Sequence, residues 1–143
     1  MGLDPTMKKI LVIDDDPDIV EFVSEILTMN HYQVQAAENG RAGIDKARKF
    51  LPDLVILDLM MPDMHGFEVC QAIRADDKLK DVRIIVSSGK RYQVDARAAD
   101  RLGGNMFVSK PYKVSQMMEA VVALIGRPED PIPTIPSDRT GPP

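Results

Sequence analysis

The 143-residue chain has one cysteine, no tryptophan and only 5% aromatic residues. Because Cys70 has no partner for an intramolecular disulfide bond, the sequence is typical of a protein from a reducing compartment. No apolar run approaches the roughly 18–20 residues of a membrane-spanning helix, and Ile10–Ile13 is too short for the core of a signal peptide. These absences disfavour secreted and membrane-spanning classes and predict a cytoplasmic protein.

The chain also has no excess of positive charge. It has 18 Lys and Arg against 22 Asp and Glu, a net charge of −4, which argues against direct nucleic-acid binding. The 44% hydrophobic content is ordinary for a globular protein. The length suits one domain, since domains cluster near ~100–150 residues and bury roughly two-thirds of their unfolded surface at this size.

The two ends of the chain differ from its middle. Residues 1–6 precede a second methionine, Met7, and we interpret them as an expression remnant or a disordered N-terminus. Residues 127–143 contain six of the 11 prolines and few large apolar side chains, which predicts a Pro-rich disordered tail or a linker. The predicted folded domain is therefore residues 7–126.

Short apolar runs alternate with helical patterns in this domain. Continuous hydrophobicity over such short runs predicts strands that are buried on both faces. The runs are Ile10–Ile13, a weaker Val34–Ala37, Leu54–Leu57, Ile84–Val86 and Met106–Val108. Apolar stripes with helical spacing follow them and begin at Ile19, Ala42, Phe67, Val94 and Val114. Five β–α pairs predict an α/β fold with a doubly wound, five-stranded parallel sheet and helices on both faces.

Several helix ends have recognisable signals. Asp16 and Pro17 form a suitable N-cap and first-turn pair for the first helix. The stripe that begins at Val94 ends at Gly103, and the last helix is expected to stop at Gly126.

Polar side chains stand where the predicted strands end. Asp14, Asp15 and Asp16 follow the first strand, and the other four positions follow later ones: Asp58, Ser87, Ser88 and Lys110. The carboxyl ends of the strands are where such sheets bind ligands. Two carboxylates ~4 Å apart repel by about 4 kcal/mol at an effective dielectric constant near 20, so the cluster needs a cation. Oxygen-only ligands favour Mg²⁺, although any one of these aspartates alone is more commonly a turn or cap residue.

Four motifs give the chain a family resemblance. They are ILVIDDDP (Ile10–Pro17), LVILDLMMPDMHG (Leu54–Gly66), RIIVSSG (Arg83–Gly89) and FVSKPY (Phe107–Tyr112). Ser88 lies 30 residues after Asp58, and Lys110 lies 52 residues after it. In motifs and intervals, residues 7–126 resemble the CheY-like response-regulator receiver domain of bacterial two-component signalling. The resemblance implies a flavodoxin-like strand order of 2-1-3-4-5.

The resemblance also implies roles for individual residues. Asp58 is the expected phosphoacceptor, assisted by Lys110 and Ser88, and a cis peptide is expected between Lys110 and Pro111. Ser88 and Phe107 are the expected switch residues, which alter the face formed by the strands at Ile84–Val86 and Met106–Val108 for partner binding. The implied Mg²⁺ ligands are Asp15, Asp58, the Met60 backbone carbonyl and, through water, Asp14.

The resemblance implies partners as well. The phosphoryl donor is expected to be a sensor histidine kinase or a histidine phosphotransfer protein. The output is expected to pass to a downstream target protein or a C-terminal output domain. This domain itself is expected to bind neither nucleic acid nor membrane. Gly104–Met106 replaces acidic residues that one DNA-binding subgroup uses for dimerisation, which disfavours that assembly. Met60 and Lys90 flank the path of attacking water; because apolar Met60 cannot orient it, we expect slow self-dephosphorylation.

The main interpretation is a phosphorylation switch that is not an enzyme, since it catalyses only its own phosphorylation and slow dephosphorylation. Two alternatives remain beside it. One is a degenerate receiver that serves as a phosphorylation-independent scaffold, which normally lacks Asp15, Asp58 or Lys110. The other is a Mg²⁺-dependent aspartyl-phosphate phosphohydrolase. That class needs a second aspartate two residues after the nucleophile, where this chain has Met60.

Overall fold

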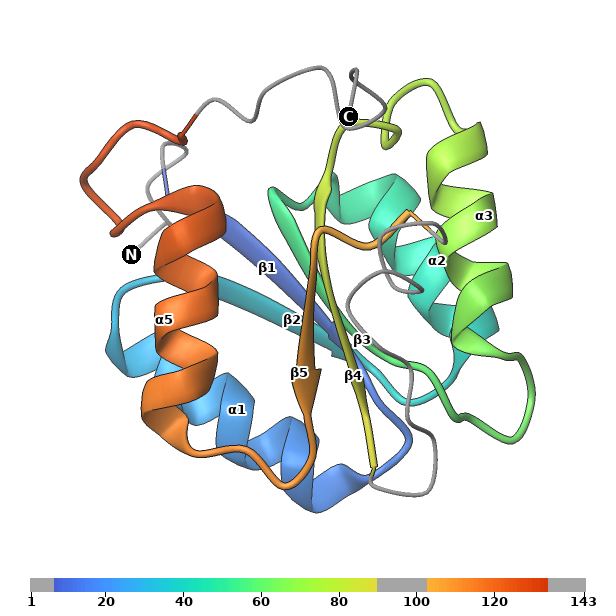
Figure 1. Ribbon diagram of the computed structural model, residues 1–143. Coiled ribbons are helices and arrows are strands. Elements are labelled where there is room, and N and C mark those ends of the chain that lie inside the picture. The colour runs from blue at the N-terminus through green and yellow to red at the C-terminus, as the bar shows by residue number, and fades with distance from the viewer. Residues whose placement is uncertain (1–6, 90–102, 134–143) are drawn as a thin grey trace, which may run out of the picture.

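The computed structural model describes residues 7–89 and 103–133. Its centre is a five-stranded parallel sheet with the order β2-β1-β3-β4-β5 (Figure 1). The strands are β1 (Lys9–Ile13), β2 (Gln33–Ala37), β3 (Leu54–Asp58), β4 (Arg83–Ser88) and β5 (Met106–Ser109). This order confirms the doubly wound, flavodoxin-like sheet.

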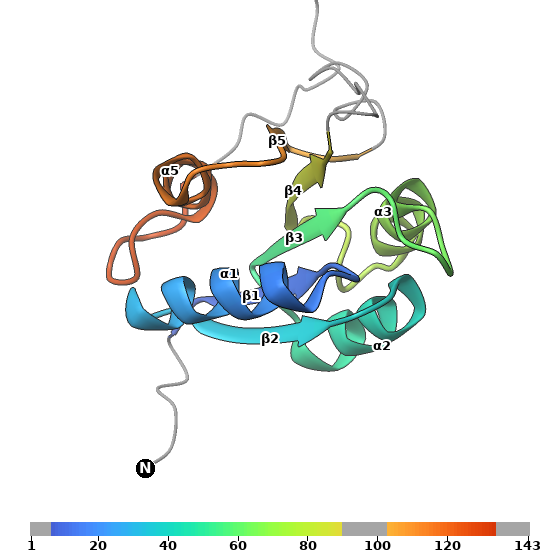
Figure 2. The same cartoon turned by 90° about the horizontal axis from the view of Figure 1, so that it is seen from below.

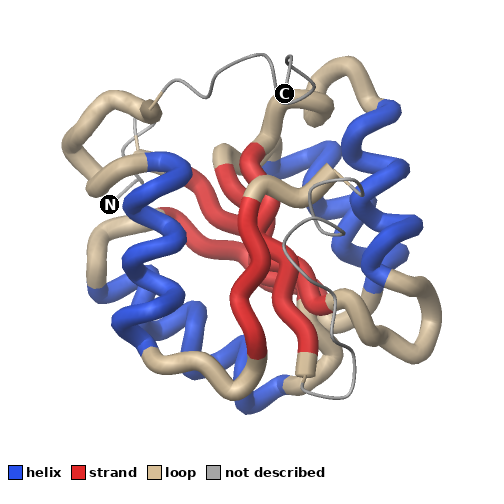
Figure 3. The backbone as a smooth tube through the Cα atoms, viewed as in Figure 1, coloured by secondary structure: helices blue, strands red, loops and turns tan. Residues whose placement is uncertain are grey.

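Helices cover both faces of the sheet. Helices α1 (Pro17–Met29) and α5 (Val114–Ile125) lie on one face, and α2 (Gly40–Phe50) and α3 (Gly66–Ala75) lie on the other (Figures 1 and 2). Figure 3 shows the strands as the middle layer between these helix pairs. The helical stripe predicted to begin at Val94 lies outside the described residues.

The core has one apolar cluster on each face, because successive strand residues point to opposite sides. In β1, Leu11 and Ile13 join the cluster under α2 and α3, whereas Ile10 and Val12 join the cluster under α1 and α5. Both faces are therefore apolar, as the continuous runs predict. Strand β2 is an edge strand in which only Ala37 is buried, which explains its weaker signal.

The helix ends follow the sequence signals where these are described. The Asp16 carboxylate accepts a hydrogen bond from the Asp18 N–H at 3.0 Å, and Pro17 opens α1. Gly126, with φ +77°, ends α5. The first helix thus starts directly beyond the acidic run and fixes that run at the carboxyl edge of the sheet.

The chain that leaves α5 contacts the opposite edge of the sheet. The buried ammonium of Lys8 donates to the carbonyl oxygens of Ile125 and Arg127, and the Tyr32 hydroxyl donates to the Gly126 carbonyl at 2.7 Å. Arg83 reaches the Pro133 carbonyl at 2.9 Å. The first residues of the expected tail therefore lie against the domain, and residues 134–143 lie outside the described part.

Lys8→Met is expected to lower the free energy of unfolding by roughly 2 kcal/mol, because hydrogen bonds to charged groups contribute ~1.5–3 kcal/mol and the carbonyls would lose their donor in a buried place. Lys46→Met is the matched control, since Lys46 donates to the Ala36 carbonyl at an exposed position. Urea unfolding of both variants measures the difference. If the two substitutions lowered the free energy of unfolding equally, the larger effect expected from the buried position of Lys8 would be contradicted.

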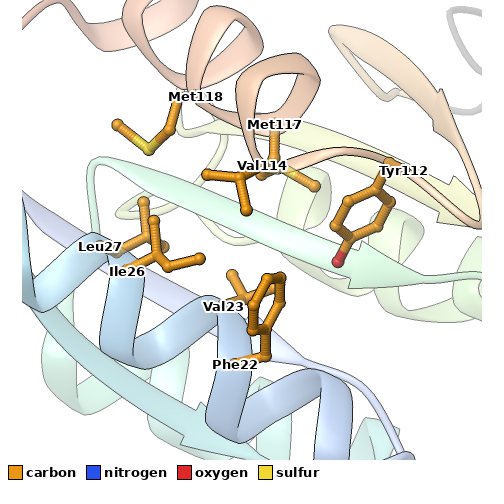
Figure 4. Close-up of a pocket in the computed structure, with 8 residues that line it drawn as sticks. All are labelled: Phe22, Val23, Ile26, Leu27, Tyr112, Val114, Met117 and Met118. Atoms are coloured by element: carbon orange, nitrogen blue, oxygen red, sulfur yellow. The ribbon is translucent and has the colours of Figure 1, made fainter.

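An apolar seam joins α1 to α5 and the loop before it. Figure 4 shows the side chains of the two segments facing each other across a narrow recess. Its lining residues are Phe22, Val23, Ile26, Leu27, Tyr112, Val114, Met117 and Met118. Phe22 remains 49% exposed at the outer rim, whereas Leu27 and Met117 belong to the core. The seam holds the loop that carries Lys110 against the first helix.

Candidate functional site at the carboxyl edge of the sheet

The structure brings the strand-end residues together. Asp14 follows β1, and Asp58 and Ser88 are the last residues of β3 and β4. One carboxylate oxygen each from Asp14, Asp15 and Asp58 lie within 4.8 Å of one another. Asp14 and Asp58 are 3% and 5% exposed, whereas Asp15 is exposed. The predicted acidic cluster therefore exists, with two of its carboxylates shielded from bulk water.

Lys110 supplies a positive charge to this cluster. Its Nζ lies 2.7 Å from Asp14 Oδ2 and 3.5 Å from Asp58 Oδ1. The loop between β5 and α5 places it there, and the Lys110–Pro111 peptide bond is cis, as expected. One ammonium facing three carboxylates leaves the cluster with net negative charge.

The electrostatics single out Asp58. Burial, and then the negative charge of Asp14, raise the pKa of Asp58 from 3.8 to about 7, although Lys110 and the Met60 N–H act in the opposite direction. Because Lys110 sits nearer to Asp14, it compensates Asp58 less. Without a further cation, Asp58 is therefore partly protonated near neutral pH, and its ionised form is the one that a cation would favour.

The donor set fits a hard divalent cation. The three side chains offer only carboxylate oxygens, and the described part of the chain brings no histidine or cysteine into the cluster. Mg²⁺ is commonly held by one or two carboxylates and several waters, which suits a cluster with one exposed member. Such an ion would compensate the remaining negative charge of the cluster and would lower the raised pKa of Asp58.

Ser88 and Phe107 lie on the neighbouring strands β4 and β5, where Phe107 pairs with Val86, two residues before Ser88. The Ser88 residue is fully buried, and its hydroxyl has no hydrogen-bond partner among the described residues. A buried hydroxyl without a partner is costly, so a hydrogen-bond acceptor placed beside Ser88 would be favourable. Phe107 lies on β5, partly buried against the cluster under α2 and α3. Lys90, expected near the water path, lies outside the described residues.

A close backbone approach holds the loop after Asp58. A Cβ on Gly66 would stand 2.6 Å from Leu59 Cα and 2.9 Å from the Asp58 carbonyl oxygen, so only glycine fits there. The Gly66 N–H donates to the Leu59 carbonyl at 2.8 Å, and the Met60 N–H donates to Asp58 Oδ1 at 3.3 Å. The loop is therefore closed tightly behind the phosphoacceptor candidate.

Sequence reasoning missed Tyr112, close to the cluster, and Asp63, in the loop that follows Asp58. Burial, followed by the charges of Asp14 and Asp58, raises the pKa of Tyr112 to about 12, so its hydroxyl stays protonated close to the cluster. Asp63 contacts the start of α2. Tyr112 was visible only as part of the FVSKPY motif, and Asp63 had no local signal beyond its place in a turn-rich loop.

A parallel doubly wound sheet with an acidic cluster and a lysine at its carboxyl edge defines a class of signalling domain. The family model for the response regulator receiver domain matches residues 10–122. The chain belongs to this family, whose members are phosphoacceptor signalling domains of two-component systems. The resemblance in the four motifs is thereby confirmed.

Individual relatives agree with this assignment. The chain is 39% identical over 121 residues to the DNA-binding dual master transcriptional regulator RpaA of Synechocystis, covering 85% of this chain and 50% of that protein. It is 34% identical over 128 residues to the DNA-binding response regulator MtrA of Mycolicibacterium smegmatis, covering 90% and 55%. The chain thus spans about half the length of the curated relatives it matches.

Solved structures show the same fold. The chemotaxis response regulator CheY4 of Vibrio cholerae superposes with a TM-score of 0.76 at 28% identity, covering 82% of this chain and 98% of that one. TrrA of Thermotoga maritima, solved in complex with Mg²⁺ and BeF, superposes with a TM-score of 0.71 at 35% identity and the same coverage. Within residues 7–89 and 103–133, no helix has the length and apolarity needed to cross a bilayer.

Proposed function

We propose that this domain is a phosphorylation-dependent switch in which Asp58 accepts a phosphoryl group. The observation that carries the proposal is the joint placement of three groups at one edge of the sheet: the buried Asp58 carboxylate, the Lys110 ammonium and the Ser88 hydroxyl, which has no partner in residues 7–89 and 103–133. A nucleophile, a cation for the phosphoryl oxygens and a spare hydrogen-bond donor are the groups that phosphoryl acceptance requires.

The transfer step uses the ionised form of Asp58. A carboxylate oxygen forms a bond to phosphorus while the bond from phosphorus to the donor imidazole nitrogen breaks, and its electron pair stays on that nitrogen. The proposed donor is a phosphohistidine of a sensor histidine kinase or a histidine phosphotransfer protein. An open recess of about 310 Å³, lined in part by Lys110 and Tyr112, is the proposed approach for the donor.

Mg²⁺ is the proposed cofactor, held by Asp15, Asp58 and the Met60 backbone carbonyl, with Asp14 acting through water. When bound, the ion would offset the negative charge of the carboxylates and of the phosphoryl group. The acidic cluster supports this assignment, as does the solved relative TrrA, whose structure contains Mg²⁺ and BeF.

The proposed output is a change of conformation around β4 and β5. Ser88 donates its spare hydrogen bond to the phosphoryl group, and Phe107 turns inward behind it. One hydrogen bond to a charged group contributes ~1.5–3 kcal/mol, whereas moving a two-state equilibrium from 1:99 to 99:1 needs about 5.5 kcal/mol. Ser88 alone is therefore insufficient, and the contact of Lys110 with the phosphoryl group must contribute to the switch.

The proposed setting is a bacterial cytoplasm, with residues 7–126 as the receiver domain and residues 127–143 as a tail or linker. Because the matched relatives are DNA-binding response regulators about twice as long, a C-terminal output domain is the proposed target beside separate downstream proteins. The acidic net charge supports a domain that does not itself bind nucleic acid.

Intact-mass measurement tests the phosphoacceptor. After incubation with acetyl phosphate and Mg²⁺, the chain is expected to gain one phosphoryl mass, and the gain is expected to disappear with EDTA or in Asp58→Asn. If acetyl phosphate adds no mass and a beryllofluoride mimic also leaves the protein unchanged, the scaffold alternative replaces this proposal. A gain of mass in Asp58→Asn would place the acceptor elsewhere.

The phosphorylated form is expected to decay slowly. Met60 stands two residues after Asp58 and has no polar group that could orient an attacking water. Met60→Glu is expected to shorten the lifetime of the phosphorylated chain, which time-resolved intact-mass measurement reports. A wild-type lifetime of seconds would contradict this prediction.

A further inference from the structure

The loop between β3 and α3 is attached to the start of α2 by one carboxylate. Asp63 Oδ1 accepts the Gly40 N–H at 3.0 Å, and Asp63 Oδ2 accepts the Arg41 N–H at 3.2 Å. Asp63 and these partners are more than 20 residues apart in the chain and belong to different elements. The two oxygens of one side chain therefore join two segments that the sequence separates.

This contact is an N-terminal cap supplied from another element. The first N–H groups of a helix have no partners within it, and they carry partial positive charge that attracts a carboxylate. The side chain of Asn39, the local cap of α2, accepts the Ala42 N–H at 2.8 Å. Asp63 binds the preceding two N–H groups, so the helix start and the loop stabilise each other.

Packing reinforces the same junction. A Cβ on Gly40 would stand 2.8 Å from Met64 Cβ and 3.0 Å from Val69 Cγ2, so the start of α2 lies directly against the loop and α3. Gly66 closes the other end of the loop against the Asp58 carbonyl oxygen, as described above. Residues 59–66 are thus held at Asp63 on one side and behind Asp58 on the other.

We propose that Asp63 is a positioning residue that anchors the β3–α3 loop to α2 and so places the Met60 backbone carbonyl and Asp58 for Mg²⁺ binding. This inference rests on the proposed function, since it concerns the same site. Asp63 acts through the backbone of the loop and does not join the acidic cluster. In this proposal the start of α2 supports the phosphorylation site without contacting it.

The test compares Asp63→Ala with a cap removed from the same helix. Asn39→Ala is the matched control, because it removes an N-terminal hydrogen bond from α2 without touching the loop. Mg²⁺ affinity is measured by NMR titration of the unphosphorylated protein, together with urea unfolding of each variant. Loss of a residue that orients metal ligands typically costs ~10–100-fold in affinity, so we expect at least ~10-fold weaker Mg²⁺ binding in Asp63→Ala. Asn39→Ala is expected to stay within twofold of the wild type.

A second Asp63 variant ensures that the test does not depend on a single substitution. Asp63→Asn keeps one acceptor oxygen of the two, so its Mg²⁺ affinity is expected between those of the wild type and Asp63→Ala. The Gly40 and Arg41 amide protons are expected to shift and to exchange faster with solvent in both Asp63 variants. Equal Mg²⁺ affinity in Asp63→Ala and the wild type, or an equal loss in Asn39→Ala, would overturn the proposal.

The same data separate this inference from the proposed function. If the wild type bound no Mg²⁺, the proposed function would fail, and the positioning role would fail with it. In that case protected Gly40 and Arg41 amides would still show the anchor as a structural contact. If the wild type binds Mg²⁺ and the Asp63 variants bind it equally well, only the positioning role is refuted.

Discussion

Replacing Lys110 with methionine is expected to lower the free energy of unfolding by about 3 kcal/mol at pH 8 in the absence of divalent cations, because removing one partner of a buried ion pair typically costs ~3–5 kcal/mol. Lys110 is the ammonium 2.7 Å from Asp14 Oδ2 and 3.5 Å from Asp58 Oδ1. The side chains of Asp14 and Asp58 are only 5% and 6% exposed, so water compensates the lost charge poorly. The lower end of the range is appropriate because Lys110 itself keeps 16% of its side-chain surface exposed.

The loss should depend on pH and on Mg²⁺. Lys110 lowers the pKa of Asp58, so its removal raises that pKa further above the unfolded value. An acid with a raised folded-state pKa is best tolerated when protonated, so the deficit of Lys110→Met should shrink as the pH falls from 8 to 5. Saturating Mg²⁺ should also reduce it by supplying positive charge.

Urea unfolding in EDTA at pH 5 and pH 8 measures this deficit. Lys110→Arg keeps the charge and is expected to lose less stability than Lys110→Met, which makes it the matched control. A Lys110→Met variant as stable as the wild type at pH 8 would show that the cluster is already neutral or hydrated, contrary to the burial and distances observed.

Much of the candidate site could be predicted from where the strands of a parallel sheet end in the sequence. Apolar runs end at Asp14, Asp58, Ser88 and Lys110, or within a residue or two of them, and parallel strands bring those ends to one edge. The sequence thus predicts the meeting of these side chains without knowledge of their distances. Strand order is different, because apolar patterning alone allows several arrangements, and here it came from the family resemblance.

Contacts between distant segments could not be predicted in this way. Asp63 reaches Gly40 across 23 residues, and Lys8 reaches the Ile125 carbonyl across 117. Neither side chain has a local pattern that marks its partner, because an exposed aspartate in a loop and a lysine before a strand are ordinary. That the Ser88 hydroxyl has no hydrogen-bond partner among the described residues is likewise a property of the packed fold and not of its sequence neighbours.

Replacing Asp58 with asparagine is expected to raise the free energy of unfolding of the metal-free domain. Burial and Asp14 raise the pKa of Asp58 to about 7, which means that its charged form is unfavourable in the folded state. Asparagine has nearly the same shape, can still accept the Met60 N–H, and carries no charge. A shift from 3.8 to about 7 corresponds to an upper limit near ~4 kcal/mol at about 1.4 kcal/mol per pH unit, and we expect ~2 kcal/mol in the variant.

The sign of the pH dependence identifies the cause. Below the unfolded-state pKa near 4, Asp58 is protonated in both states and does not lower the free energy of unfolding. As the pH rises towards 7 the loss of stability grows, and above pH 7 it is constant. The stability difference between Asp58→Asn and the wild type should therefore be near zero at pH 4 and largest above pH 7. Urea unfolding in EDTA across this range measures it, and a difference that does not vary with pH would contradict the assignment to Asp58.

The double variant Lys110→Met/Asp58→Asn measures the interaction energy between Lys110 and Asp58. Residues that share one charge cluster have non-additive effects, with interaction energies of ~0.5–3 kcal/mol. Because the asparagine removes one of the two charges that Lys110 compensates, Lys110→Met should cost less in the Asp58→Asn background than in the wild type. Strictly additive effects would mean that Lys110 stabilises Asp14 alone, and the 3.5 Å separation from Asp58 would then have no energetic consequence.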